Sequence, residues 1–281
     1  MVLHQPNAVD LHMHSIHSDG QLPVQAIIDF AANAGLRAIS ITDHDTVEGV
    51  EEAMQLGHEN GLEVIAGIEL SATIENRDIH ILGYFFNHKD KNFLNRIAHF
   101  KNERYNRAEK MVRKLNNAGV KLQMDSVMEF AGQAAVGRPH IADAMVKHGF
   151  AESIEVAFRD YIGYGGIAYE DKFNITPEEA IRIIADAGGL SFLAHPSLHL
   201  KQKYLYQVIH SGISGIETIH PNHSENSSSY YKRIVLQHGL LESGGSDCHG
   251  RNGEINIGKY AVPYAAIEAM KQRLEKKAGV P

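Results

Sequence analysis

Cysteine is nearly absent from the 281-residue sequence, which contains only Cys248. A single cysteine excludes an intrachain disulfide, and it also excludes a zinc site built from thiolates. Long apolar runs are missing as well: none approaches the roughly 20 residues that a membrane span requires. The N-terminus has neither the basic nor the apolar region of a signal peptide. We therefore expect a cytoplasmic protein that does not act in a membrane.

Basic residues do not dominate either, because 27 Lys and Arg stand against 34 Asp and Glu, for a formal net charge of -7 at pH 7. A protein that holds duplex DNA through many phosphate contacts needs the opposite balance, so we expect no duplex DNA partner. A short anionic substrate stays compatible with this charge. Carboxylates that bind metal ions would leave the local field positive.

Outside its middle part, the chain alternates short apolar runs with amphipathic segments, which is typical of an α/β protein. Interleaved helices predict a parallel sheet, and seven strands in one domain favour a barrel over an open sheet. The predicted strands cover 9–13, 38–42, 62–70, 79–85, 190–194, 215–218 and 240–243. The predicted helices cover 23–34, 47–60, 176–187, 202–210 and 225–238.

Residues 91–169 interrupt this rhythm with helical patterns at 93–117, 125–131, 139–148 and 153–161. We predict an inserted helical subdomain here, acting as a cap on a barrel domain formed by 1–90 and 170–281. The return loop contains Gly163, Gly165 and Gly166 beside Tyr164 and Tyr169. Glycines of this kind indicate a position where a cap could hinge.

Two histidines and an aspartate follow the first predicted strand. His12 and His14 are two residues apart, so on a strand both side chains project from one face and can bind one ion. The pair alone is a weak signal, because such alternation also arises by chance or on a solvated face. Asp19 lies in a Ser-Asp-Gly turn that brings it to the same rim. A simple turn or helix cap would also use an aspartate there.

The next strands end on ionisable residues in the same way. His44 is a candidate ligand. Asp43 is expected to orient a ligand by a hydrogen bond without binding the ion itself, and Asp45 is expected to cap the following helix. Glu69 interrupts an apolar stretch, where an unpaired carboxylate is costly to bury and a cation would remove that cost. His80 also interrupts an apolar run, although a lone histidine there is more often a hydrogen-bonded core residue.

Two late motifs strengthen this pattern. His195 ends a buried strand, and Asp247 and His249 are paired after another strand just as the first two histidines are. Chance easily explains one strand that ends on an ionisable residue, but it does not easily explain six such strands. Nitrogen and carboxylate ligands without thiolates suit zinc, manganese or iron, whereas calcium and magnesium prefer oxygen alone. The motifs occur in the order HMH at 12–14, SDG at 18–20, TDHD at 42–45, GIE at 67–69, His80, AHP at 194–196 and SDCH at 246–249.

Together these motifs resemble the PHP family, named for polymerase and histidinol phosphatase, over almost the whole chain. The resemblance implies a distorted (β/α)7 barrel with three divalent metal ions, either Mn, Fe or Zn. It also implies phosphoester hydrolysis by a hydroxide that bridges two ions, without a side-chain nucleophile. The implied ligand sets are His12, His14, Glu69 and Asp247; Glu69, His80 and His195; and Asp19, His44 and His249.

Within that family, VGRPHIA at 136–142 and IHPNHS at 219–224 resemble a bacterial branch. Its members remove the 3′-phosphate of 3′,5′-bisphosphonucleotides, and some trim short RNA from the 5′ end. The resemblance implies that Arg138 and His140 contact phosphate, and a guanidinium can bind phosphate bidentately. A surface ion pair is an equally common role for an arginine at a helix start. His223 is implied as a contact to the second phosphate or the base, with His220 as the alternative.

Some positions depart from the family pattern, and other functions compete with it. Asp19 stands where the histidinol-phosphatase branch carries a histidine, which favours the nucleotide-directed branch. Cys248 replaces an aromatic residue and is expected to point away from the metals, and His17 has no assigned role. The alternatives are a histidinol-phosphatase-like enzyme, an amidohydrolase and a metal-binding module without activity. The amidohydrolases often bridge their metals with a carboxylated lysine, and Glu69 occupies that position here.

Overall fold

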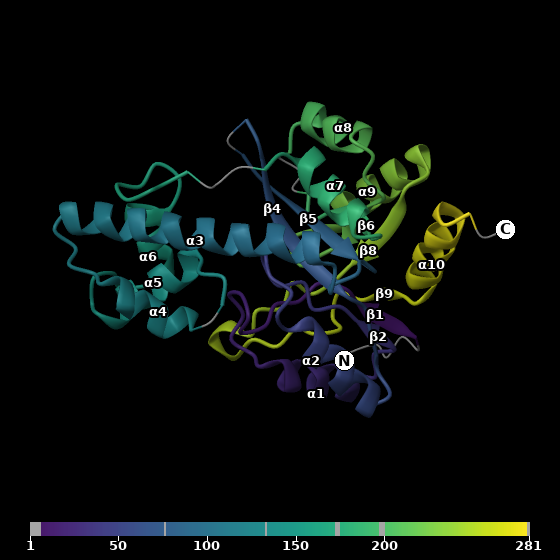
Figure 1. The fold of residues 1–281 in the computed structure, drawn as a ribbon, viewed down its shortest axis with the longest axis horizontal. Coiled ribbons are helices and arrows are strands. Elements are labelled where there is room, and N and C mark those ends of the chain that lie inside the picture. Colours follow the sequence, from purple (N-terminus) through teal and green to yellow (C-terminus); the bar gives the residue numbers. More distant parts are fainter. Residues whose placement is uncertain (1–6, 76, 133, 172–174, 197–199, 280–281) are drawn as a thin grey trace.

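The computed structural model describes residues 7–75, 77–132, 134–171, 175–196 and 200–279. They form a mixed α/β fold in which helices lie on both sides of two sheets (Figure 1). No helix of these residues is both long and apolar enough to cross a membrane. The strands are β1 (Ala8–Asp10), β2 (Ala38–Ile39), β3 (Glu63–Val64), β4 (Gly67–Ile74), β5 (Arg77–Tyr84), β6 (Leu190–Leu193), β7 (Gly215–Ile219), β8 (Leu241–Gly244) and β9 (Val262–Pro263).

The strand pairing differs from the predicted all-parallel sheet. One sheet has the order β3-β2-β1-β9 and the other the order β4-β5-β6-β7-β8. β5 runs antiparallel to β4 and β6, so the parallel prediction is wrong for this strand. β9, where no strand was predicted, runs antiparallel to β1. The connection from β4 to β5 is only two residues long, and a parallel pair needs a crossover of a dozen or more. The predicted barrel is not confirmed, since the two sheets are not closed.

Backbone contacts beyond the strand ends join the two sheets where the ionisable motifs lie. Met13 pairs with Cys248 and His44 pairs with Glu69 as isolated parallel bridges. The Asp247 amide donates to the His12 carbonyl at 2.7 Å. Segments that follow β1, β2 and β8 are therefore held against one another and against β4.

The helices agree with the predicted spans to within a few residues, and α10 and β9 near the C-terminus were not predicted. Thr176 caps α7 with its side chain, and Glu179 bonds back to the Thr176 amide, which fixes where that helix begins. The helices are α1 (Val24–Asn33), α2 (Val50–Glu59), α3 (Lys91–Asn117), α4 (Met124–Ala131), α5 (Arg138–Lys147), α6 (Ile154–Ala157), α7 (Pro177–Asp186), α8 (Gln202–His210), α9 (Glu225–His238) and α10 (Ala265–Lys277), with a π-helical turn η1 (Phe158–Ile162) and a 3-10 turn η2 (Arg251–Gly253).

The long helix α3 belongs to two apolar clusters. Phe93, Ile97 and Phe100 in its first half pack in the core that includes β4, β5 and α7. Met111 and Leu115 in its second half pack with α4, α5 and η1 in a separate cluster. Figure 1 shows α4, α5 and α6 gathered beside the far part of α3, away from the sheets. The helices α4, α5 and α6 thus bury apolar side chains among themselves and against the second half of α3.

Asp10 is a fully buried carboxylate that holds three loops at the end of β1. It accepts hydrogen bonds from the amides of Ser246 at 2.9 Å, Gly258 at 2.8 Å and His12 at 3.4 Å. A buried amide that loses its acceptor costs free energy, because neither water nor another group replaces the bond. The Asp10 side chain therefore stabilises the segments that carry His12 and Asp247.

We expect Asp10→Ala to lower the free energy of unfolding by about 2–4 kcal/mol, since several buried amides would lose their acceptor together. Urea denaturation of the metal-free variant and parent protein measures this difference. Asp29→Ala, at an exposed position of α1, is the matched control and should change stability by less than about 0.5 kcal/mol. Equal stability of the two variants would contradict the role assigned to Asp10.

Candidate metal centre

His12 and His14 are fully buried and face one another after β1. Their Nε2 atoms lie 3.2 Å apart. His12 Nδ1 lies 2.9 Å from a carboxylate oxygen of Glu217, and a proton on that nitrogen leaves a lone pair on Nε2. Burial lowers the pKa of His12, but the carboxylates of Glu217, Asp247 and Glu69 raise it well above its usual value. Binding of a cation at Nε2 would therefore release a proton.

The Glu69 carboxylate is at the centre of the cluster, with only 1% of its surface exposed. Its Oε2 atom lies 3.2–3.3 Å from ring nitrogens of His12, His14 and His44. Its Oε1 atom lies 2.8 Å from His80 Nδ1 and 2.9 Å from His195 Nε2. Burial opposes ionisation, yet His44, His80 and His12 hold the pKa of Glu69 well below its usual value. One carboxylate thus faces ligand nitrogens from five histidines.

Asp247 approaches the same pair of histidines from the end of β8. Its Oδ1 atom lies 3.3 Å from His12 Nε2 and 3.1 Å from His14 Nε2, and Oδ2 lies 3.2 Å from His220 Nε2. Asp247 has φ 49° and His195 has φ 25°, in the region that residues with a Cβ rarely adopt. Such backbone strain persists where the surrounding structure holds a functional side chain in place.

Asp19, His44 and His249 form the third part of the cluster, next to His14. Asp19 Oδ1 lies 3.3 Å from His249 Nε2 and 3.8 Å from His14 Nδ1. Asp19 Oδ1 and His44 Nδ1 are buried without a hydrogen-bond partner in the part of the chain that the structure describes. Unsatisfied buried polar atoms are rare, and a bound cation would satisfy both. The donor set therefore fits divalent transition metals with nitrogen and oxygen ligands.

The structure brings all nine residues that the sequence analysis named as metal ligands into one cluster. The grouping differs in part from the predicted sets. The Asp19 set recurs with His14 added, the His12 set recurs without Glu69, and His80 and His195 approach Glu69 in two separate groups. Within each group the ligand atoms all lie within 4.8 Å of one another. The groups are His14, Asp19, His44 and His249; His12, Glu69 and His195; His12, His14 and Asp247; and His44, Glu69 and His80.

The sequence analysis missed one residue of the site, Glu217, and named another, His220, only as an alternative. Glu217 on β7 is fully buried, bonds His12 and accepts from the His195 amide at 2.6 Å. Its motif, Gly-Ile-Glu at 215–217, repeats the pattern of Gly-Ile-Glu at 67–69, so an acidic residue in an apolar strand was the available signal. His220 had been considered only as an alternative to His223, and it contacts Asp247.

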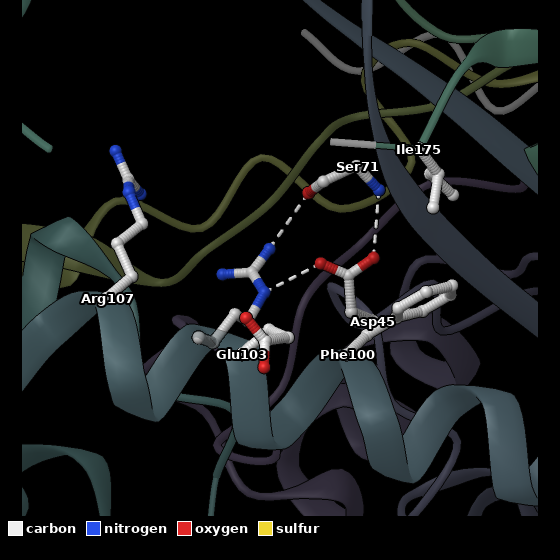
Figure 2. A pocket seen from close by; sticks show the side chains of 7 residues that line it. Asp45, Ser71, Phe100, Glu103, Arg107 and Ile175 are labelled. Carbon is white, nitrogen blue, oxygen red and sulfur yellow. Dashed lines mark hydrogen bonds and ion pairs between the residues drawn. The ribbon is translucent and has the colours of Figure 1, made fainter. Parts of the chain in front are cut away.

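The neighbouring aspartates have different roles. Asp43 accepts from the Ser15 amide at 2.7 Å and from the Ser15 and Ser18 hydroxyls at 2.6 Å, so it holds the loop that carries Asp19. The predicted helix cap by Asp45 is wrong, because α2 begins after Gly49. Asp45 instead accepts from the Ser71 amide at 2.8 Å and pairs with Arg104 Nε at 2.6 Å. Figure 2 shows these contacts beside α3.

Cys248 and His17 are the two residues to which the sequence analysis gave no chemistry. Cys248 is buried in an apolar cluster, as expected. The side chain of His17 is partly exposed and lies 3.9 Å from a carboxylate oxygen of Glu48 and 3.8 Å from one of Glu52, both on the surface near α2. Neither residue belongs to the groups of candidate metal ligands.

The residues predicted to contact substrate lie at different distances from the cluster. Arg138, the first residue of α5, pairs with Asp78 at 3.4 Å. His140 Nδ1 accepts from the Gly137 amide at 3.0 Å, and burial lowers the pKa of this ring. His223 lies near the carbonyls of Thr218 at 3.2 Å and Pro196 at 3.0 Å, so both nitrogens face the backbone. His220, the alternative to His223, contacts Asp247 of the cluster.

The sequence matches the PHP domain family over residues 10–185. It is 30% identical to the 5′-3′ exoribonuclease Rnm of Escherichia coli, over 95% of this chain and 94% of that protein. It is 28% identical to the 3′,5′-nucleoside bisphosphate phosphatase of Chromobacterium violaceum, over 86% of this chain and 87% of that protein. It is also 27% identical to the phosphoribosyl 1,2-cyclic phosphate 1,2-diphosphodiesterase of Eggerthella lenta, over 90% and 98% of the two chains.

Solved structures share the fold. A predicted metal-dependent phosphoesterase of Bifidobacterium adolescentis superimposes with a TM-score of 0.86 at 28% identity, over 94% of this chain and 96% of that one. An amidohydrolase of Chromobacterium violaceum, with bound sulfate and no metal, superimposes with a TM-score of 0.82 at 27% identity, over 95% and 96%.

The fold and the cluster of histidines and carboxylates define a metal-dependent phosphoesterase. The chain belongs to the PHP domain family. Like the relatives named above, it is a hydrolase that acts on phosphoester bonds.

We expect Glu217→Gln to weaken Mn²⁺ binding by roughly 10–100-fold, because the carboxylate that orients His12 would lose its charge. A chelator-competition titration measures this affinity, and circular dichroism checks that the fold is retained. Glu242→Gln, on the neighbouring strand β8, is the matched control. If both variants bind Mn²⁺ as the parent does, Glu217 does not support the site.

Proposed function

We propose that the protein hydrolyses the 3′-phosphate of 3′,5′-bisphosphonucleotides and also releases nucleotides from the 5′ end of short RNA. The observation that carries this proposal is the buried Glu69 carboxylate, whose two oxygens face five histidines. The substrate class is supported by the relatives named as a nucleoside bisphosphate phosphatase and an exoribonuclease.

The cofactor we propose is a set of three divalent ions, of Mn, Fe or Zn. Their ligands would be the three sets given by the sequence motifs, with Glu69 shared between two of them. When bound, such ions supply Lewis acidity and an activated water for attack on phosphorus. Three carboxylates, Asp19, Glu69 and Asp247, leave part of the ionic charge uncompensated, which favours a phosphate dianion.

A cavity of about 390 Å³ adjoins the cluster and is a suitable place for the reacting phosphate. It is lined on one side by Asp19, Asp247 and His249, and on the other by Pro139 and Phe158. The last two residues belong to α5 and η1. This shared lining supports the proposal that residues 91–169 form a cap over the domain built from 1–90 and 170–281.

Arg251 supports the same wall of this cavity. Its Nη2 donates to the Asp19 carbonyl at 2.7 Å, and its Nη1 lies 3.3 Å from Asp143 on α5. The cap helix and the Asp19 turn are thereby tied to one side chain. In the proposed enzyme this contact orients Asp19 and leaves its carboxylate directed toward His249.

The proposal is tested by phosphate release from adenosine 3′,5′-bisphosphate by manganese-reconstituted protein, beside a metal-stripped sample. Histidinol phosphate, a 5′-phosphorylated short RNA, and an amide and a lactone are the comparison substrates. Fast metal-dependent turnover of the bisphosphate supports the proposal. Turnover of histidinol phosphate alone would identify a histidinol-phosphatase-like enzyme instead. Turnover of the amide or the lactone alone would identify an amidohydrolase instead. No turnover with all ions bound favours a binding module.

Asp19→Ala is expected to reduce kcat for the bisphosphate by roughly 100-fold, because one ion would lose its carboxylate ligand. The variant should keep the thermal unfolding temperature of the metal-free parent to within a few degrees. Steady-state kinetics with metal content measured on the same samples checks this. If the variant has the turnover and the full metal content of the parent protein, Asp19 is not a ligand that the reaction needs.

Arg138→Ala is expected to raise KM for the bisphosphate roughly tenfold with little change in kcat, since a charge-assisted hydrogen bond to phosphate is worth about 1.5–3 kcal/mol. Arg113→Ala, at an exposed position of α3, is the matched control. A change confined to kcat would mean that Arg138 does not act in substrate binding.

A further inference from the structure

A second cavity, of about 410 Å³, lies beside the cap and is not used by the proposed chemistry. It is lined by two tyrosines, two arginines and two carboxylates: Tyr164, Tyr169, Arg77, Arg138, Glu75 and Asp78. Arg138 lines this cavity and the adjacent Pro139 lines the first one, so only the first turn of α5 separates them. Asp78 is two residues from His80 on β5, so both side chains project from the same face of that strand. The second cavity is therefore next to the metal cluster.

The tyrosines give this cavity an aromatic wall that is open to solvent. Tyr164 is 81% exposed, and it stands in the loop formed by Gly163, Gly165 and Gly166. Its ring is 5.5 Å from that of Tyr169 at an interplanar angle of 69°, an edge-to-face arrangement. A large, exposed ring that is supported by another ring is suited to stacking against a flat ligand. Every nucleobase offers such a face.

The two carboxylates of the cavity already have cationic partners, and Arg77 adds a further positive charge to the lining. Asp78 pairs with Arg138, and Glu75 pairs with Lys203 at 3.0 Å. The Asp78 side chain is 42% exposed and its contact with Arg138 is 3.4 Å long, so an entering phosphate can replace it.

Arg107 on α3 lies near Tyr169 but is not among the residues that line this cavity, and its Nε donates to the Glu170 carbonyl at 2.9 Å. Its guanidinium carbon lies 6.0 Å from the centre of the Tyr169 ring. Its Nη2 atom is buried and has no hydrogen-bond partner within the described residues. Burial and the charges of Arg138 and Arg104 lower the pKa of Arg107 to about 10, whereas the Asp78 carboxylate acts to raise it. Figure 2 shows its side chain rising from α3 apart from the contacts of Asp45 and Ser71.

We propose that this cavity binds a nucleobase on Tyr164 and a non-reacting phosphate at Arg138 and Arg77, the two arginines of its lining. It would hold the part of the substrate that extends from the reacting phosphate in the first cavity. The inference rests on the proposed function, and it assigns the nucleotide specificity of that site to the cap and its return loop. A ligand with phosphate but without a base would use only half of this cavity.

The absence of tryptophan from the sequence makes a direct binding test available. Tyr164→Trp places the chain's single tryptophan in the aromatic wall, and a stacked adenine quenches indole emission. We titrate the metal-loaded variant with adenosine 5′-monophosphate, which keeps the base and the non-reacting phosphate of the substrate. Saturable quenching by this nucleotide, and none by ribose 5-phosphate, is expected. Phe30→Trp, on the exposed face of α1, is the control and should show no saturable quenching.

Kinetics of Tyr164→Ala provide the second readout. Loss of one base-stacking contact, worth about 1–3 kcal/mol, should raise KM for adenosine 3′,5′-bisphosphate roughly tenfold or more, and Tyr164→Phe should restore it. An increase seen only with the 5′-phosphorylated short RNA also supports the cavity and assigns the stacked base to the neighbouring nucleotide of RNA. Parental KM for both substrates would overturn the inference.

The two proposals fail in different ways. If the bisphosphate is hydrolysed while adenosine 5′-monophosphate does not quench the Tyr164→Trp fluorophore, the cavity does not bind the base and the proposed function survives. If the nucleotide saturably quenches the fluorescence of the variant while no phosphate ester is hydrolysed, the cavity binds the base but the proposed function is wrong. Quenching by ribose 5-phosphate equal to that by the nucleotide would overturn the stacking role of Tyr164.

Discussion

The structure depends on one buried carboxylate, that of Glu69. Removing a carboxylate from water costs several kcal/mol unless cations or hydrogen bonds replace the lost hydration. Here ring nitrogens of five histidines from four separate segments lie within 3.3 Å of its two oxygens. These contacts bring together segments that are far apart in the sequence. A divalent ion between the carboxylate and the rings satisfies both at once, which is why the cluster is understood as a metal centre.

A second layer of buried acids holds the segments that carry the candidate ligands. Asp10 and Asp43 accept from backbone amides, and Glu217 accepts from the amide of His195 as well as facing the ring of His12. Hydrogen bonds of this kind hold a loop in one conformation and at the same time set the tautomer of a ligand. Strained backbone at His195 and Asp247 is maintained by the same contacts.

The helices of residues 91–169 meet this centre on its open side. Their own apolar cluster packs them together, and only a few of their side chains reach the two cavities. Arg138 and Pro139 stand at the boundary between those cavities. In the proposed enzyme the candidate metal ligands and the substrate contacts therefore come from different parts of the chain, since a shared fold can carry many different sites.

The sequence by itself determined the types of the candidate ligands, because these follow from local patterns: apolar runs, residue spacing and turns. The predicted position at a strand end is wrong for Glu69 and His80, which lie inside β4 and β5. The sequence also predicted most helices, whose 3.6-residue period is equally local. Only the tertiary structure decided that β5 runs antiparallel, that Asp45 binds Arg104 instead of capping α2, and that Glu217 and His220 belong to the site. Each of these depends on residues distant in sequence, and the energy of such a contact is set by the partner that folding brings to it.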